Sequence, residues 1–110
     1  MSGRIRAFEK DNFETEVLKN ENIVLVDFYA TWCGPCRSMT PILEEVARDL
    51  AGKVVVGKVD VDENEDLANR FGISSVPSML IFSKGEVAGR IVGLTPKRVI
   101  LEKLNNLESE

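Results

Sequence analysis

An α/β domain built on a central mixed β-sheet is the fold class that the sequence predicts. Two apolar, β-branched runs at 23–30 and 53–61 are typical of buried parallel strands, and a stretch with helical periodicity separates them. Two shorter strand-like runs, at 78–82 and 87–92, are joined by the turn sequence SKGE, which predicts an antiparallel hairpin. Strands that alternate with helices imply parallel crossovers, whereas the hairpin adds antiparallel pairing. We therefore expect about five strands flanked by about four helices.

The N-terminal region is expected to contribute one short strand and one helix. Residues 5–8, with the sequence IRAF, can form the opening strand. Asp11 followed by Glu14 has the spacing of a capping box, in which each side chain satisfies a free backbone N–H group of the other residue. This spacing predicts a helix over 11–20.

The longest predicted helix follows the strand at 23–30. It is expected to open at Pro35, because proline is favoured at the first helical position. Its apolar positions recur at helical spacing: Met39, Ile42, Leu43, Val46, Ala47 and Leu50. Pro41 within this pattern predicts a kink, and Gly52 can end the helix.

Two further helices are expected in the second half of the chain. The first follows the strand at 53–61 and covers about 64–71, with Gly72 as its stop signal. The second follows the hairpin, with Thr95 as its cap and Pro96 at its first position. The apolar face of this last helix consists of Ile100, Leu104 and Leu107.

The composition argues against several classes of function. The chain has 110 residues, enough to bury one core, and its net charge is −4. It contains no basic cluster, so nucleic acid is not an expected partner. The longest apolar runs, such as 23–26, are far too short to cross a bilayer, and residues 1–16 turn acidic before a signal-like core could form. We therefore expect a cytoplasmic protein that makes no membrane contact.

The two cysteines of the chain, Cys33 and Cys36, are separated only by Gly34 and Pro35. Three interpretations are open: a structural staple, part of a metal site, or a redox pair. A staple that closes so short a loop contributes only about 2 kcal/mol, and structural disulfides are rare in the cytosol. A metal site needs further ligands, but the chain has no histidine and no second cysteine pair, so carboxylates or a second chain would have to supply them.

A redox pair accounts best for the position of these cysteines. Cys33 would precede the helix that opens at Pro35, where free N–H groups and the positive end of the helix dipole favour a thiolate. The thiolate is the nucleophile in thiol–disulfide exchange. Cys36, one turn into the helix, is expected to be more buried and close enough to displace the first bond formed. We therefore expect Cys33 to attack and Cys36 to resolve.

The sequence resembles the thioredoxin family in a set of motifs that occur in register. These motifs are VDFYA, WCGPC, KVDVDEN, FGISSVPSMLIF and GEVAGRIVGLTP. A bare C-x-x-C pair is a weak signal, whereas this set covers nearly the whole chain and is specific. The resemblance implies the thioredoxin fold over residues 1–110 as a single domain, and a monomer.

The resemblance also implies two residues that support the cysteines. Asp27 interrupts an apolar strand, and on the residues alone it could equally lie at an edge or face solvent. Thioredoxins carry a buried aspartate at the matching position, where burial would raise its pKa and make it a proton acceptor for Cys36. Lys58 matches a lysine that lies near this aspartate in the family, although by itself it is typical of a solvated strand. Asp60 and Asp62 are expected to be loop or capping residues.

A docking surface for substrates around Cys33 is implied as well. Val76 and Pro77 resemble the family's loop that faces the active site, where the proline is cis and the backbone before it pairs with an extended substrate strand. The residues expected to form this surface are Trp32, Gly34, Pro35, Val76, Pro77 and Gly93. The chain departs from the usual family pattern at Tyr29, Arg37 and Ser78, where tryptophan, lysine and threonine are common. These departures leave the reaction intact but put the choice of partner in doubt.

The expected function is the reduction of protein disulfides by the Cys33–Cys36 couple. No bound cofactor or metal is expected, because the chain lacks a Gly-rich dinucleotide fingerprint. The resemblance implies that a thioredoxin reductase, usually a flavoprotein that uses NADPH, restores the dithiol. One alternative is an oxidase or isomerase on the same fold, although isomerases of this superfamily usually carry Gly-His between the cysteines. Another is a non-enzymatic subunit of a larger assembly, which a fully functional double Cys33→Ser, Cys36→Ser variant would support.

Overall fold

The computed structural model describes residues 4–108, and its strands form a five-stranded sheet in the order β1-β3-β2-β4-β5. The strands are β1 (Ile5–Ala7), β2 (Ile23–Tyr29), β3 (Val54–Asp60), β4 (Ser78–Ser83) and β5 (Glu86–Val92). Strands β1 and β2 both pair parallel with β3, whereas β4 pairs antiparallel with β2 and with β5. The predicted mixed sheet with a C-terminal hairpin is therefore confirmed.

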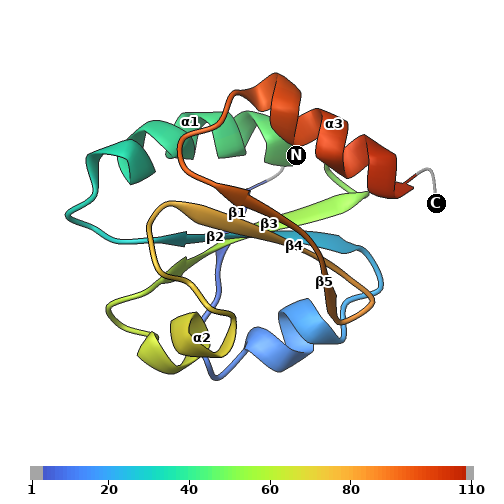
Figure 1. Cartoon of the computed structure of the whole chain (residues 1–110). Coiled ribbons are helices and arrows are strands. Elements are labelled where there is room, and N and C mark those ends of the chain that lie inside the picture. The colour runs from blue at the N-terminus through green and yellow to red at the C-terminus, as the bar shows by residue number, and fades with distance from the viewer. Residues whose placement is uncertain (1–3, 109–110) are drawn as a thin grey trace.

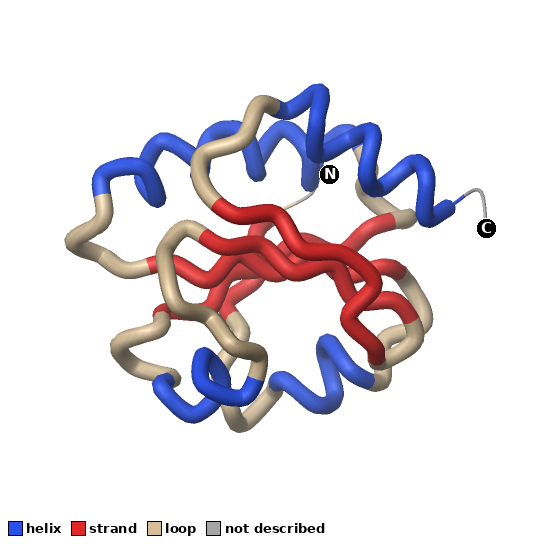
Figure 2. Tube along the Cα trace, in the orientation of Figure 1, coloured by secondary structure: helices blue, strands red, loops and turns tan. Residues whose placement is uncertain are grey.

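Within the described part of the chain, four helical segments cover the two faces of this sheet. They are η1 (Glu14–Leu18), α1 (Gly34–Asp49), α2 (Glu65–Arg70) and α3 (Lys97–Glu108). Figure 1 shows α1 and α3 together on one face, while α2 and the N-terminal η1, drawn in blue, lie on the other. The same three layers are visible in Figure 2, where helices lie above and below the strands.

The central strand β2 is buried on both faces, which explains its uninterrupted apolar run. Side chains alternate along a strand, and Leu25 packs in a core cluster with residues of α1 and α3: Met39, Leu43, Val46, Ile100 and Leu104. The residues on the opposite face of β2 are Val24, Val26 and Phe28, and they pack in a second cluster with Phe8, Phe13 and Leu67. Asp27 has the same parity as Leu25, so it lies on the face that α1 and α3 cover.

The expected helix over 11–20 is wrong in extent, type and cap. A short π-helix forms from Glu14 to Leu18, in which the N–H group of Lys19 donates to the carbonyl of Glu14, five residues earlier. Phe13 occupies the cap position and makes no side-chain capping bond, so the predicted capping box of Asp11 and Glu14 does not form. Phe13 is buried edge-on against Phe82, with ring centroids 5.6 Å apart. Packing of this ring helps to hold the segment in place without the expected capping box.

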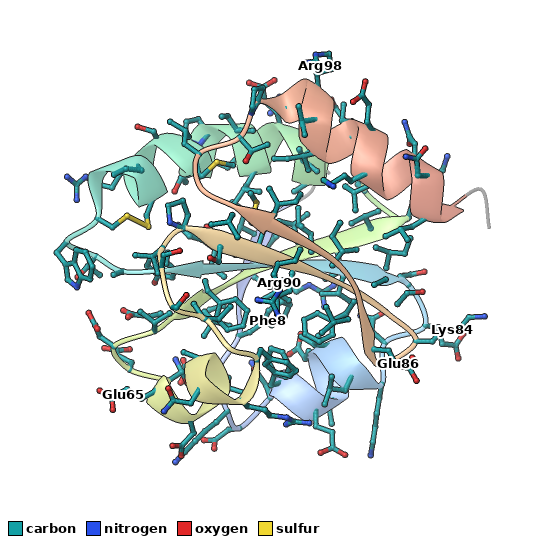
Figure 3. All side chains as sticks on the ribbon, in the orientation of Figure 1. Phe8, Glu65, Lys84, Glu86, Arg90 and Arg98 are labelled. Atoms are coloured by element: carbon teal, nitrogen blue, oxygen red, sulfur yellow. A yellow bond between two sulfur atoms is a disulfide. The ribbon has the colours of Figure 1, made fainter. Side chains whose placement is uncertain are left out.

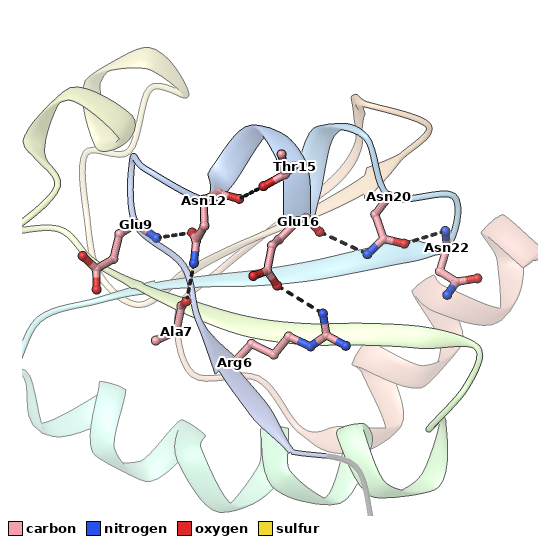
Figure 4. A network of polar contacts seen from close by, with 8 residues as sticks. All are labelled: Arg6, Ala7, Glu9, Asn12, Thr15, Glu16, Asn20 and Asn22. Atoms are coloured by element: carbon pink, nitrogen blue, oxygen red, sulfur yellow. Dashed lines mark hydrogen bonds and ion pairs between the residues drawn. The ribbon is translucent and has the colours of Figure 1, made fainter.

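The side chain of Asn12 organises the turn before η1 (Figure 4). Its Oδ1 accepts a hydrogen bond of 2.8 Å from the backbone N–H of Glu9, and its Nδ2 donates to the carbonyl of Ala7 at 3.2 Å. Arg6 on β1 forms an ion pair with Glu16 of η1 at 3.2 Å. Because this ion pair is exposed, it contributes little to stability, and we attribute the anchoring of the segment chiefly to Asn12 and the buried rings.

The hairpin and the last helix lie where the sequence predicts them. Lys84 and Gly85 both have positive φ, 52° and 83°, which is typical of a two-residue type I′ turn between β4 and β5. The helix α3 begins at Lys97, and the hydroxyl of Thr95 donates to the carbonyl of Gly93 at 2.9 Å. Donating this hydrogen bond does not prevent the hydroxyl from accepting one, and the expected cap at Thr95 stays a prediction. Within residues 4–108, no helix combines the length and apolar character needed to cross a membrane.

Candidate active site

Cys33 ends the loop between β2 and α1, Cys36 lies in the first turn of α1, and the two form a disulfide at the start of that helix (Figure 3). Strand β2 ends at Tyr29 and α1 begins at Gly34, so Cys33 occupies the N-cap position of the helix. This loop lies at the carboxyl end of a central strand, where ligands and chemistry concentrate in open α/β sheets. The disulfide therefore lies at the edge of the sheet where a second molecule can bind.

The helix N-terminus acts on the sulfur of Cys33. The backbone of Cys33 is extended, with φ −93° and ψ 114°. The Sγ atom of Cys33 accepts a hydrogen bond of 3.1 Å from the backbone N–H of Cys36. In the dithiol form the same N–H group and the helix dipole would stabilise a negative charge on this sulfur. The geometry thus favours Cys33 as the thiolate of the pair.

The two cysteine residues differ less in burial than the sequence suggests. The exposed fraction is 5% for Cys33 and 2% for Cys36, so the expected order holds but both residues are buried. Cys33 is covered because it packs with Ala30 and Val76, and its Sγ lies 3.8 Å from the carbonyl oxygen of Val76. Polarity at the helix start, rather than exposure, distinguishes the two sulfurs.

The loop before β4 brings the predicted docking residues to the disulfide. The Val76–Pro77 peptide bond is cis, as the family resemblance implied. The carbonyl of Pro77 accepts a hydrogen bond of 2.8 Å from the N–H of Gly93, whose φ of 90° suits a residue without a side chain. Pro77 is itself buried, whereas Gly34 and Pro35 at the start of α1 are exposed. The rim of the disulfide is thus formed by segments far apart in the sequence.

Trp32 forms one wall of an open hollow beside the disulfide. Its side chain is 68% exposed, and the hollow of about 200 Å³ is lined by Trp32, Val61, Ile73, Ser74, Ser75 and Val76. The indole Nε1 of Trp32 donates a hydrogen bond of 2.9 Å to Oδ2 of Asp62. The sequence predicts only a loop or capping role for Asp62 and does not indicate this contact. Its one sequence signal is a position just beyond the end of β3, at the same edge as the cysteines.

Asp27 is fully buried beneath this edge of the sheet. Its side chain is 0% exposed, and neither carboxylate oxygen has a hydrogen-bond partner among residues 4–108. Burial raises the pKa of Asp27 from 3.8 to about 7, although the charge of Lys58 acts in the opposite direction. The expected burial is confirmed, and the alternative in which Asp27 faces solvent is wrong. Its role in proton transfer stays a prediction.

Lys58 lies directly beside Asp27 in the register of β2 and β3, as the resemblance implied. Its Nζ donates a hydrogen bond of 2.9 Å to Oγ1 of Thr40 and lies 4.4 Å from the centroid of the Tyr29 ring. These groups border a second hollow, of about 230 Å³, lined by Tyr29, Ala30, Thr31, Cys36, Arg37, Thr40 and Lys58. No sequence pattern indicates Thr40 as a site residue, although it follows Cys36 by one helical turn.

Comparison with known proteins agrees with this geometry. The family model for thioredoxin matches residues 4–106.

The chain belongs to the thioredoxin family.

Several relatives carry the family name over most of their length. "Thioredoxin 2" of Chlorobaculum tepidum is 44% identical over 105 residues, which are 96% of each chain. "Thioredoxin" of Chlorobaculum thiosulfatiphilum is 46% identical over 86% of this chain and 87% of its own. "Thioredoxin" of Rickettsia bellii is 47% identical over 86% of this chain and 90% of its own.

Membership of the thioredoxin family decides how the cysteine pair is interpreted. The chain is a protein-disulfide oxidoreductase, and its disulfide between Cys33 and Cys36 is the oxidised half of a dithiol–disulfide couple. Among residues 4–108, no cluster of three or more histidine, cysteine, aspartate or glutamate residues is arranged to hold a metal ion. Family membership confirms the redox interpretation of the sequence.

Proposed function

We propose that this thioredoxin-family protein reduces disulfide bonds in other proteins, with Cys33 as the attacking thiol and Cys36 as the resolving thiol. The observation that carries the assignment is the hydrogen bond from the N–H of Cys36 to Sγ of Cys33 at the start of α1. A thiolate on Cys33 is stabilised by this donor and by the helix dipole, and a thiolate is the species that attacks a disulfide.

The reaction balances over two exchanges. The thiolate of Cys33 attacks one sulfur of the substrate disulfide, which forms a mixed disulfide and releases the other substrate sulfur as a thiolate. The thiol of Cys36 then loses its proton and attacks Sγ of Cys33, which releases the second substrate sulfur. The substrate gains two electrons, and the protein is left with the Cys33–Cys36 disulfide.

We assign Asp27 as the acceptor of the proton that Cys36 loses, directly or through a water molecule. A carboxyl group with a pKa of about 7 is a far stronger base than an ordinary aspartate, so it can take a proton from a thiol near neutral pH. The location of Asp27 on the sheet face that α1 covers supports this assignment, since Cys36 lies in the first turn of that helix. Lys58, its neighbour on β3, influences the basicity of this carboxyl group.

We assign substrate docking to the rim of the disulfide. The carbonyl of Val76 lies beside Sγ of Cys33 and can accept a hydrogen bond from an extended substrate strand, which is a common mode of peptide recognition. An apolar side chain of the substrate can pack against the exposed ring of Trp32, in the hollow beside it. Gly34, Pro35, Pro77 and Gly93 shape this rim and keep it free of bulky side chains.

The remaining parts of the proposal concern the cellular setting. The oxidised protein would be returned to the dithiol by a thioredoxin reductase, which supplies electrons from NADPH through a flavin, so the chain itself would hold no cofactor. We propose that it acts in the cytoplasm as a monomer and a single domain. Its mild net charge of −4 and lack of a basic cluster support protein partners rather than nucleic acid.

Single-cysteine variants test the order of the two exchanges. Mixed with a disulfide-containing protein, Cys36→Ser should accumulate a covalent complex through Cys33, because the resolving thiol is missing. Cys33→Ser should accumulate none, and the complex should dissociate when dithiothreitol is added. Mass spectrometry of the trapped complex identifies the linked cysteine. A complex that forms with Cys33→Ser and not with Cys36→Ser would reverse the assignment.

A further inference from the structure

Lys58 makes no hydrogen bond with the buried carboxylate beside it. The two residues are register partners on adjacent parallel strands, and side chains opposite each other in a sheet point to the same face. Both oxygens of Asp27 nevertheless lack a hydrogen-bond partner among residues 4–108. An ammonium group next to a carboxyl group therefore directs its hydrogen bond elsewhere.

Thr40 on α1 receives that hydrogen bond. Its Oγ1 accepts from Nζ of Lys58 at 2.9 Å and donates to the carbonyl of Cys36 at 3.4 Å. The hydroxyl group thus uses both its accepting and its donating capacity. It ties the ammonium group to the first turn of the helix, the turn that contains the resolving cysteine.

The Tyr29 ring holds the same ammonium group from another side. Nζ of Lys58 lies 4.4 Å from the ring centroid, within the range of a cation–π contact. Lys58 is only half-buried, and its head group borders the hollow of about 230 Å³ between α1 and the sheet. Thr40 and Tyr29 together fix the ammonium group at this opening.

Among residues 4–108, Lys58 is the one cation whose charge shifts the pKa of Asp27. Its register partner on β4 is Met79, which does not ionise, and the α1 and α3 residues in the adjoining core cluster are apolar. Tyr29, further along β2, has a raised pKa because it is partly buried and lies near the negative charges of Asp60, Glu63 and Asp27. Cys36 is held in the disulfide in this form, and Arg37 is exposed at the hollow and donates to the carbonyl of Thr31.

We propose that Thr40 is a positioning residue, which holds the Lys58 ammonium group against the Tyr29 ring and away from the Asp27 carboxyl group. A carboxylate that pairs with an ammonium group is a weaker base, so this restraint keeps Asp27 able to accept the proton of Cys36. The functional part of the inference rests on the proposed role of Asp27. The structural part, that Thr40 controls how Lys58 acts on Asp27, does not.

The titration of Asp27 in the oxidised protein tests the structural part directly. In this form the disulfide keeps both cysteines from titrating, so the carboxyl carbon of Asp27 can be followed by NMR against pH. Thr40→Val removes the hydroxyl group at nearly constant shape, and Asp27 should then titrate at a pH lower by about one unit, as expected when an opposite charge comes close. Thr40→Ala should give the same result, and Thr40→Ser should titrate like the parent protein.

A second pair of variants shows whether the effect passes through Lys58. In a Lys58→Met background the ammonium group is absent. The double variant Lys58→Met, Thr40→Val should therefore titrate at Asp27 at the same pH as Lys58→Met alone. A remaining effect in that background would overturn the inference. So would Thr40→Val and Thr40→Ala proteins that titrate like the parent, or a Thr40→Ser protein that behaves like Thr40→Val.

Single-turnover kinetics separate this inference from the proposed function. If Asp27 accepts the proton, Thr40→Val should shift the pH profile of resolution by Cys36 in the same direction as the Asp27 titration. If Asp27→Asn resolves the mixed disulfide at the parental rate, the proposed role of Asp27 fails. A lowered Asp27 titration in Thr40→Val would in that case still support the positioning of Lys58 by Thr40.

Discussion

Replacing Asp27 by asparagine would remove an ionisable group from the protein interior while keeping nearly the same shape. The parent carboxyl group is fully buried, without a hydrogen-bond partner among residues 4–108, and burial raises its pKa from 3.8 to about 7. An amide at the same position cannot ionise. The variant should therefore be more stable than the parent at neutral pH, even though its reduction of disulfides should be slower.

The size and the pH window of this effect follow from the pKa of Asp27. Below pH 3.8 the carboxyl group is protonated in both the folded and the unfolded chain, so ionisation costs the native state nothing. As the pH rises from there to about 7, the unfolded chain ionises first and the native state loses stability. Above both values the loss is about 4 kcal/mol, at about 1.4 kcal/mol per pKa unit. The advantage of Asp27→Asn should grow across this window and then stay constant.

Urea unfolding of the oxidised proteins at several pH values measures this difference. The free energy of unfolding of Asp27→Asn minus that of the parent should rise by several kcal/mol between pH 4 and pH 8, while the dependence on urea concentration stays the same. Asp11→Asn is a matched control, because Asp11 is exposed in the turn before η1. Its difference from the parent should be near zero throughout. A difference for Asp27→Asn that is independent of pH, or that falls with pH, would refute the reasoning.

Two further substitutions test the packing of the sheet and the rim of the site. Gly57→Ala should lower the free energy of unfolding by about 1–3 kcal/mol, since its Cβ would lie 2.6 Å or less from three atoms of the Phe8 ring. Gly34→Ala, whose Cβ would lie 3.9 Å from the nearest atom beyond its chain neighbours and the adjacent backbone of α1, should lose no stability in the same urea assay, and equal losses would contradict the argument. Asp62→Ala should raise KM for a protein disulfide about fivefold by freeing the Trp32 indole, with Tm unchanged. In a Trp32→Phe background it should have no further effect on KM, and an undiminished effect there would place the cause elsewhere.

The parts of the fold that the sequence predicted well are those that burial dictates. The strands expected at 23–30 and 53–61 appear as Ile23–Tyr29 and Val54–Asp60, because strands covered on both faces are apolar almost throughout. The prediction of a helix over 11–20 is wrong because its capping-box pattern describes only local hydrogen bonds. The buried ring of Phe13 overrode that pattern through contacts with residues distant in the sequence.

The candidate site likewise has features that the sequence predicts and contacts that it does not. The cysteine pair has a local signature, since its spacing and its position before a helix are visible in the sequence itself. The hydrogen bond between Lys58 and Thr40 joins residues 18 apart, and the one between Trp32 and Asp62 joins residues 30 apart. Threonine and aspartate at such positions follow no periodic pattern, so only the folded arrangement of α1 on the sheet reveals their partners.

The redox potential of the Cys33–Cys36 couple tests the central claim, that this protein is a reductant of protein disulfides. It can be measured by equilibrating the protein with glutathione buffers of known composition and quantifying the dithiol. We expect a value of about −270 mV, which is a reference value for thioredoxins rather than one calculated from this structure. Each 30 mV corresponds to about 1.4 kcal/mol, so reductants and oxidants are well separated. A potential between about −180 and −120 mV, the range of disulfide isomerases and oxidases, would contradict the proposed function.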